Sequence, residues 1–174
     1  MNWKILFLLP VFFVTAQTAL ADTYFAAQEA PDPERTLRQA LEEEGHTRFL
    51  KLLEDAQLQD YLDKTGITLL VPDPEWFESL SDEEYGNLVS NREAVREALH
   101  AHTLDGLYSE RDLTTDAKVK SLSGEAVAIE VDEEVGLVVN GLIVLRGDIV
   151  GQGFVLHVVD DFFVYIEESE PVDS

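Results

Sequence analysis

Four histidines are the side chains of this sequence best suited to chemistry near neutral pH, because an imidazole can carry a proton or ligate a metal. They are His46, His100, His102 and His157. His100 and His102 lie two residues apart, so on a strand they would share one face and could form a metal pair. No third ligand accompanies them. We therefore expect no metal site, and we expect His102 and His157 to be hydrogen-bonded structural residues at strand starts.

The serines and carboxylates do not form a catalytic pattern. Ser121-Leu122-Ser123-Gly124 lacks the Gly-x-Ser-x-Gly arrangement of a nucleophile turn. The acidic residues number 35, so a hydrolytic carboxylate pair can be drawn almost anywhere, and abundance without spacing indicates nothing. Acidic runs such as Asp132-Glu133-Glu134 lack the glycine and spacing of a calcium loop, which favours solvated faces. The sequence predicts no catalytic residue, no cofactor and no enzyme activity.

The net charge limits the kinds of partner that this chain can bind. It is −23 at pH 7, from 12 basic and 35 acidic residues. Such a surface repels nucleic acid phosphates and anionic membranes, so we expect no nucleic acid partner. The sequence contains no cysteine, which excludes disulfides, thiolate metal sites and a cysteine-linked lipid anchor.

The first 21 residues have the order of a cleaved export signal. Lys4 precedes an apolar stretch from Ile5 to Val14, and Ala19-Leu20-Ala21 is a small-x-small cleavage site. The stretch is too short for a stable membrane span. We expect a signal peptide over 1–21 and a flexible lead-in over 22–33. Cleavage after Ala21 would remove Lys4, which changes the net charge from −23 to −24. The expected location is secreted, either periplasmic or extracellular.

The positioning elements fall into a helical first half and a strand-rich second half. Leu37 to Leu41 begins three short apolar helical segments, and Ser81 with Glu84 and Ser90 with Glu93 fit capping boxes. The expected strands are Ile67–Val71, Val119–Leu122, Ala126–Val131, Gly136–Val139, Leu142–Leu145, Phe154–Val159 and, at the end, Phe162–Ile166. Asn140-Gly141 is a strong two-residue hairpin signal. This order predicts an α+β domain.

Arg146-Gly147-Asp148 is a tripeptide that many integrins recognise. Recognition requires an exposed loop. The tripeptide lies between the apolar runs Leu142–Leu145 and Ile149-Val150, which predicts a strand connection. We expect the tripeptide to be coincidental.

Two apolar segments and their surroundings resemble the fasciclin domain, a secreted adhesion module. Thr68 to Phe77 is similar to the first signature of the family, in which a buried strand ends at a proline and an acidic-aromatic helix follows. Gly153 to Asp160 is similar to the second, with His157 and Asp160 in its His-x-x-Asp. Leu99 to Gly106 resembles the central segment that usually carries a Tyr-His pair, of which only His102 is present because residue 101 is alanine.

The resemblance implies a fasciclin-like β-wedge of mostly antiparallel strands with packed N-terminal helices. It implies one domain over 34–166, followed by an acidic disordered tail over 167–174. It further implies a non-enzymatic adhesion or extracellular-matrix interaction module, whose partner is a cell-surface or matrix protein or glycan. Gly147-Asp148-Ile149 matches an adhesive segment of the family, so Asp148 and Ile149 are the best surface candidates, with His102 acting through the fold.

An alternative function is a soluble binder of an apolar small molecule such as a carotenoid or lipid, because some secreted fasciclin-like proteins bind carotenoids. Trp76 follows two prolines at a helix start and is amphipathic enough to be half exposed. Trp76, Phe154 and Phe162 are the candidate lining residues, although core packing explains them equally well. A contiguous apolar groove would favour this alternative, and a flat polar face would favour adhesion.

Overall fold

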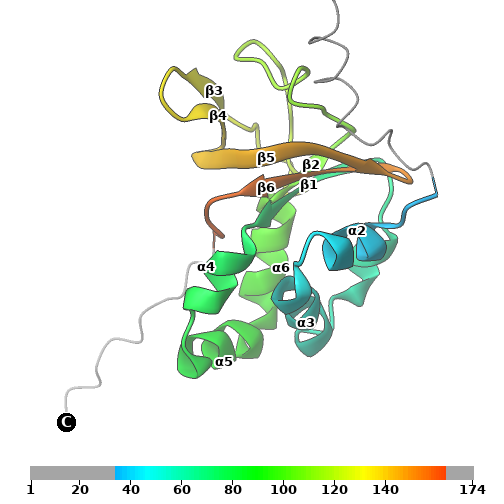
Figure 1. The fold of residues 1–174 in the computed structure, drawn as a ribbon, viewed down its shortest axis with the longest axis vertical. Helices are drawn as coiled ribbons and strands as arrows, with labels where there is room; N and C mark the ends of the chain where they lie inside the picture. The colour runs from blue at the N-terminus through cyan, green and yellow to red at the C-terminus, as the bar shows by residue number, and fades with distance from the viewer. Residues whose placement is uncertain (1–33, 164–174) are drawn as a thin grey trace, which may run out of the picture. The chain divides into compact units, whose positions relative to one another are not determined.

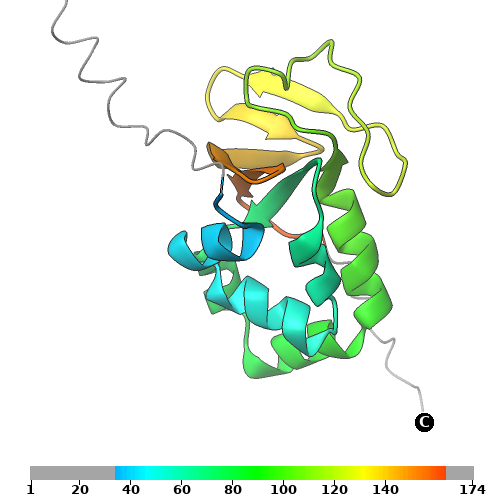
Figure 2. The ribbon, with the colours of Figure 1, turned by 90° about the vertical axis from the view of Figure 1, so that its right-hand side faces the viewer.

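The computed structural model describes residues 34–163, which form a six-stranded sheet with helices on one face. The strands run in the order β2-β1-β6-β5-β4-β3. Figures 1 and 2 show the helices gathered on one side of the sheet, with the β3–β4 hairpin and the loop before it on the other. The predicted signal peptide, lead-in and acidic tail lie outside the described residues.

The helical layer is built from short, capped segments. Its elements are α2 (Leu37–Glu43), α3 (Thr47–Asp55), the 3-10 helix η1 (Gln59–Asp63), α4 (Pro74–Ser79), α5 (Asp82–Ser90) and α6 (Arg92–Ala101). The Ser81–Glu84 capping box is confirmed at α5. The box predicted at Ser90 is wrong, because Ser90 ends α5 and its hydroxyl donates to the Asn87 carbonyl. Asn91 caps α6 instead.

The strands are β1 (Ile67–Pro72), β2 (Thr103–Asp105), β3 (Ile129–Asp132), β4 (Gly136–Val139), β5 (Leu142–Gly151) and β6 (Phe154–Val159). Two interior strands, β1 and β6, are the parallel pair, and every residue of both is buried. Continuous apolar runs suit strands covered on both faces. The two signature segments are therefore buried strands, as expected.

Two apolar cores flank the sheet. The larger core lies between the helices and one face of β1 and β6, and contains Leu69, Phe154 and Leu156. The smaller core lies on the other face, where Leu70 and Val159 meet the residues of the 104–142 region. The alternation of side chains along a strand separates the two sets.

Some predicted strands differ from the observed ones. Val119–Leu122 and Ala126–Ala128 contribute only isolated bridges, because the Ser123-Gly124 turn makes a small loop there. Phe162 and Phe163 are not in a strand, and 164–166 lies outside the described residues. The Asn140-Gly141 hairpin is confirmed, with positive φ at both residues as its turn type requires.

Candidate functional site

The segment around Asp148 is a bulge inside β5, so the predicted strand connection at Arg146-Gly147-Asp148 is wrong. Arg146 is paired with Val158 of β6, and Ile149 is paired with Leu156. Two residues of β5 therefore face the single residue His157, which is the arrangement of a β-bulge. Asp148 has φ of 58°, a left-handed conformation that Asp adopts more readily than most residues.

Hydrogen bonds to the His157 ring hold the bulge in place. The Asp148 N–H donates to His157 Nδ1 at 3.2 Å, so the neutral ring carries its proton on Nε2 and donates to the Tyr108 carbonyl at 2.9 Å. The side chain is fully buried, and burial lowers its pKa. His157 lies in the middle of β6, so its predicted place at a strand start is wrong.

The Asp148 carboxylate links the bulge to the loop that follows β2. Its Oδ1 accepts from the Glu110 N–H at 2.8 Å. Asp148 remains exposed, so the carboxylate sits on the surface in a defined position. Gly147 is required by packing, because a Cβ there would overlap the Glu110 carboxylate and lie 2.6 Å from His157 Nδ1. Packing therefore explains why glycine occupies the middle position of the tripeptide.

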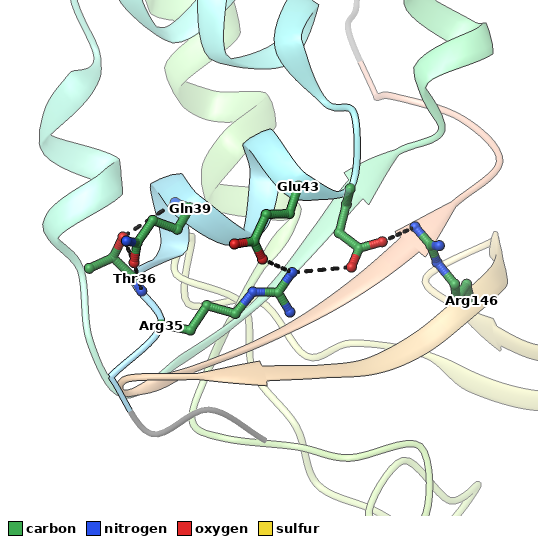
Figure 3. Close-up of polar contacts among 6 residues, drawn as sticks. Arg35, Thr36, Gln39, Glu43 and Arg146 are labelled. Atoms are coloured by element: carbon green, nitrogen blue, oxygen red, sulfur yellow. Dashed lines mark hydrogen bonds and ion pairs between the residues drawn. The ribbon is translucent and has the colours of Figure 1, made fainter. Parts of the chain in front are cut away.

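Arg146 points to the helical layer. Its Nη2 lies 2.6 Å from Oε2 of Glu44, just after α2. Glu44 also pairs with Arg35 at 3.2 Å, and Arg35 pairs with Glu43 at 2.6 Å. Figure 3 shows this alternating row of charges between α2 and β5. Arg146 and Asp148 therefore bond to different elements and do not form a free recognition loop.

Ile149 is not on the surface. Its side chain is only 9% exposed and packs in the larger core, so the expected exposure is wrong. Regular pairing of β5 with β6 resumes after the bulge at Ile149. Its apolar side chain therefore points inward, while the side chain of Asp148 faces solvent. Of the two predicted surface candidates, only Asp148 is accessible.

His102 is buried and hydrogen-bonded, as predicted. It caps the end of α6 directly before β2. Its Nε2 accepts from the Phe163 N–H at 2.8 Å, so Nδ1 carries the proton and donates to the Leu70 carbonyl at 3.2 Å. Burial lowers its pKa to about 4, against the weaker opposing effects of the Leu70 carbonyl and the Asp161 carboxylate. The ring is neutral at physiological pH.

The two nitrogens of His102 leave no lone pair for a metal. His100 and His102 lie at the end of α6 and not on a strand, and His100 packs against the ring of Tyr61 with centroids 5.9 Å apart. Within residues 34–163, no group of three or more histidine or acidic side chains could hold a metal ion. In the same range, no helix is long and apolar enough to cross a bilayer.

Trp76 is half-buried and belongs to an aromatic cluster with Phe49, Phe77 and Phe162. Its ring centroid lies 4.9 Å from that of Phe77 and 5.6 Å from that of Phe162. Phe162 also contacts His102, at 4.7 Å. The structure thus brings Trp76 and His102 to one cluster and places Asp148 elsewhere.

The predicted lining residues do not line the groove that the structure shows beside α6. Phe154 and Phe162 are buried in the larger core. A groove of about 420 Å³ lies instead along α6, where its apolar wall is made by Ala94, Ala98, Ala101 and Phe163. Phe163 is held there by its backbone bond to His102.

The residues that hold the bulge in place were missed at the sequence level. Tyr108 and Glu110 act through a carbonyl and an N–H, and backbone groups leave no signature in residue type. Glu44 is one of 35 acidic residues, so nothing marked it as the partner of Arg146. Only His157 was detectable, as a lone polar residue in an apolar strand.

A family model and a solved structure are similar to this chain. The model of the fasciclin domain matches residues 44–165. A similar solved structure is that of a FAS1 domain pair from the insect cell adhesion molecule Fasciclin I, with a TM-score of 0.61 and 21% identity. The match covers 78% of this chain and 52% of that chain, so this chain spans about half of the insect domain pair. No curated protein matches.

Proposed function

Because the chain belongs to the fasciclin domain family, we propose that it is a secreted, non-enzymatic adhesion module that binds a cell-surface or matrix protein or glycan. The resemblance to this family and the mixed helix-and-sheet fold are confirmed. Fasciclin domains are adhesion-related modules and are generally non-enzymatic. The export signal predicted over 1–21 favours a periplasmic or extracellular location.

The observation that carries the proposal is the exposed, anchored carboxylate of Asp148. The bulge, the His157 ring and the Glu110 N–H hold this side chain in one position at the surface. A contact group that is already ordered loses little entropy on binding. We propose that Asp148 contacts the partner and that His102 acts only by stabilising the fold.

The net negative charge of the protein limits which surfaces it can bind. At −23, the protein repels anionic glycans such as heparin and favours neutral or cationic surfaces. Binding of the purified protein to immobilised type I collagen, chitosan and heparin tests this. We expect binding to collagen or chitosan and none to heparin. Failure to bind both collagen and chitosan, or a preference for heparin, would overturn the proposal.

The Asp148→Asn variant tests the surface. Asparagine keeps an oxygen for the Glu110 N–H and tolerates a positive φ, so it removes the charge and preserves the bulge. We expect binding to fall about fivefold or more, which corresponds to about 1 kcal/mol. Asp105→Asn, at an exposed position on β2, is the matched control and should bind as wild type. Equal loss in both variants would mean that net charge alone drives binding.

The groove along α6 favours a second candidate function, binding of an apolar small molecule such as a carotenoid or lipid. Its volume of about 420 Å³ falls in the range of small-molecule sites. Ala101→Trp should fill the groove, and Ala128→Trp adds the same side chain at an exposed position outside it. If wild type and Ala128→Trp co-elute with added β-carotene and Ala101→Trp does not, this function is supported. No co-elution with wild type excludes it for this ligand.

A further inference from the structure

The strand β3 is one edge of the sheet, and no strand of the described chain pairs with its outer side. β3 pairs with β4 over four residue pairs, from Ile129 with Val139 to Asp132 with Gly136. The segment around Ser121 bridges β2 on its outer side and also bonds to Ala126 and Val127 just before β3, so the unpaired edge begins only at β3 itself. Figure 1 shows the β3–β4 hairpin at one end of the molecule, away from the helices.

The register shows which backbone groups of β3 are unpaired. The Asn140 N–H donates to the Ala128 carbonyl. Hydrogen-bonded pairs alternate along an antiparallel ladder, so Glu130 and Asp132 also bond to β4, whereas the N–H and C=O of Ile129 and Val131 point outward. Within residues 34–163, no other strand or loop bonds to the outward groups of Val131. An edge of this kind is a template for another strand.

Along β3, apolar and acidic side chains alternate between the two faces of the strand. Val131 is 65% exposed, and Val135 in the hairpin turn is 46% exposed. Glu130 and Asp132 lie on the other face of the strand and are also exposed. Residues 121–145 contain five acidic and no basic side chains.

This chemistry excludes a second copy of the chain as the occupant. Two β3 strands side by side would bring acidic residues together across the new ladder, and like charges in that position are destabilising. The net charge of −23 adds repulsion between the copies. A strand with basic residues facing Glu130 and Asp132, and apolar residues facing Val131, would instead complement both faces.

We propose that the edge of β3 binds an extended segment of a partner protein in which basic and apolar residues alternate. The segment adds a seventh strand, with main-chain bonds to Val131 and side-chain pairing to the acidic face. This surface is separate from Asp148, so it does not depend on the adhesive role proposed for the bulge.

The test uses a synthetic seven-residue peptide of alternating lysine and valine, acetylated and amidated. Two matched peptides accompany it, one with glutamate in place of lysine and one with its valines N-methylated to remove backbone donors. We expect the lysine peptide to bind about tenfold more tightly than either. We also expect amide exchange at Val131 to slow in its presence, because that N–H becomes hydrogen-bonded.

Two variants locate the binding. Val131→Pro removes the outward N–H and leaves the bonds to β4 intact, because proline is tolerated on an edge. Glu130→Lys with Glu133→Lys brings the net charge of residues 129–134 from −4 to zero, and Glu78→Lys with Glu83→Lys makes the same charge change on the helical layer. We expect the proline variant and the β3 charge variant to weaken binding of the lysine peptide about tenfold. The charge variant on the helical layer should leave this binding nearly unchanged. Val131→Lys replaces the proline variant if that variant unfolds.

Two results would overturn the proposal. One is equal affinity for the lysine peptide and its N-methylated form, which would mean attraction to net charge without strand pairing. The other is unchanged amide exchange at Val131 at a saturating concentration of the lysine peptide. Either would assign the acidic residues of β3 to protection of the edge against self-association.

Discussion

His102 and His157 are chemically alike and serve different parts of the molecule. Both are fully buried and neutral, and both use their two ring nitrogens on backbone groups. His102 joins the central strand β1 to the segment at Phe163 and packs against two aromatic rings. His157 joins the β5 bulge to the loop at Tyr108.

The difference lies in what each partner does. The partners of His102 are core groups, so this ring supports the contact between the sheet and the aromatic cluster. The partners of His157 lead to an exposed carboxylate, so this ring supports a surface. Burial of a histidine therefore does not reveal its role. The role follows from the segments to which the ring is hydrogen-bonded. Five measurements test these roles and the structure around the two rings.

The largest expected effect is at Leu70, whose carbonyl bonds to His102 and whose side chain fills the smaller core. Leu70→Ala should lower the free energy of unfolding by about 2–5 kcal/mol, through lost burial and a cavity. Val158→Ala on the neighbouring strand should cost less, because it removes less side chain. Urea unfolding measures both. Val131→Ala, at an exposed site, is the control, and equal midpoints for all three would contradict the core assignment.

The second effect is acid sensitivity from His102. Its pKa is about 4 in the folded state and 6.5 when free, so below pH 6.5 the unfolded chain takes up a proton that the folded chain does not. Stability should therefore fall as the pH drops from 6.5 to about 4, by about 3 kcal/mol in total.

His102→Gln lacks this titration and should show a flatter dependence of unfolding free energy on pH in that window. His100→Gln is the control, because His100 is half exposed and its pKa is also lowered, chiefly by burial. Falling pH also protonates carboxylates in every variant, so only the difference between the two variants reports on His102. Parallel curves would mean that His102 contributes no more to the pH dependence of stability than His100 does.

The third measurement compares the two histidines directly. His102→Ala and His157→Ala should each cost about 1–3 kcal/mol, because each leaves buried backbone groups unpaired. Only His157→Ala should speed amide exchange at Asp148, whose N–H it releases. Only His102→Ala should speed exchange at Phe163. The same exchange pattern in both variants would remove the distinction between core and surface roles.

The fourth measurement concerns Asp148 itself. Asp148→Ala should cost about 1–2 kcal/mol, because it loses the bond to Glu110 and places alanine at a positive φ. Asp148→Asn should stay within about 0.5 kcal/mol of wild type. Thermal unfolding of both variants checks this, and equal stability of the two would mean that the bulge does not depend on this side chain.

The smallest expected effect is that of salt. Repulsion in a chain of charge −23 weakens as ions screen it, so the melting temperature should rise by about 2 °C or more when sodium chloride goes from low to molar concentration. Screening also weakens exposed pairs such as Arg146–Glu44, which keeps the gain small. A steady fall in melting temperature would show that attractive pairs outweigh the repulsion.

The central strands could be predicted because their signal is local. Ile67–Val71 and Phe154–Val159 are apolar at every position except Thr68 and His157, and strands buried on both faces favour that pattern. Asn140-Gly141 fixed its hairpin because few residue pairs accept two positive φ angles. The site was less predictable, since Asp148 is bonded by Glu110, which lies 38 residues away along the chain.

Residue types alone therefore determined the fold class, the family, the buried strands and the strongly acidic character, because hydrophobic pattern and charge are properties of the chain itself. The tertiary structure decided that Ile149 is buried, that Arg146 pairs with the helical layer and that β3 forms an open edge. Each of these depends on which distant segment lies alongside. Each bulge inserts an extra residue that shifts the alternation of side chains along the strand, and no local pattern records it.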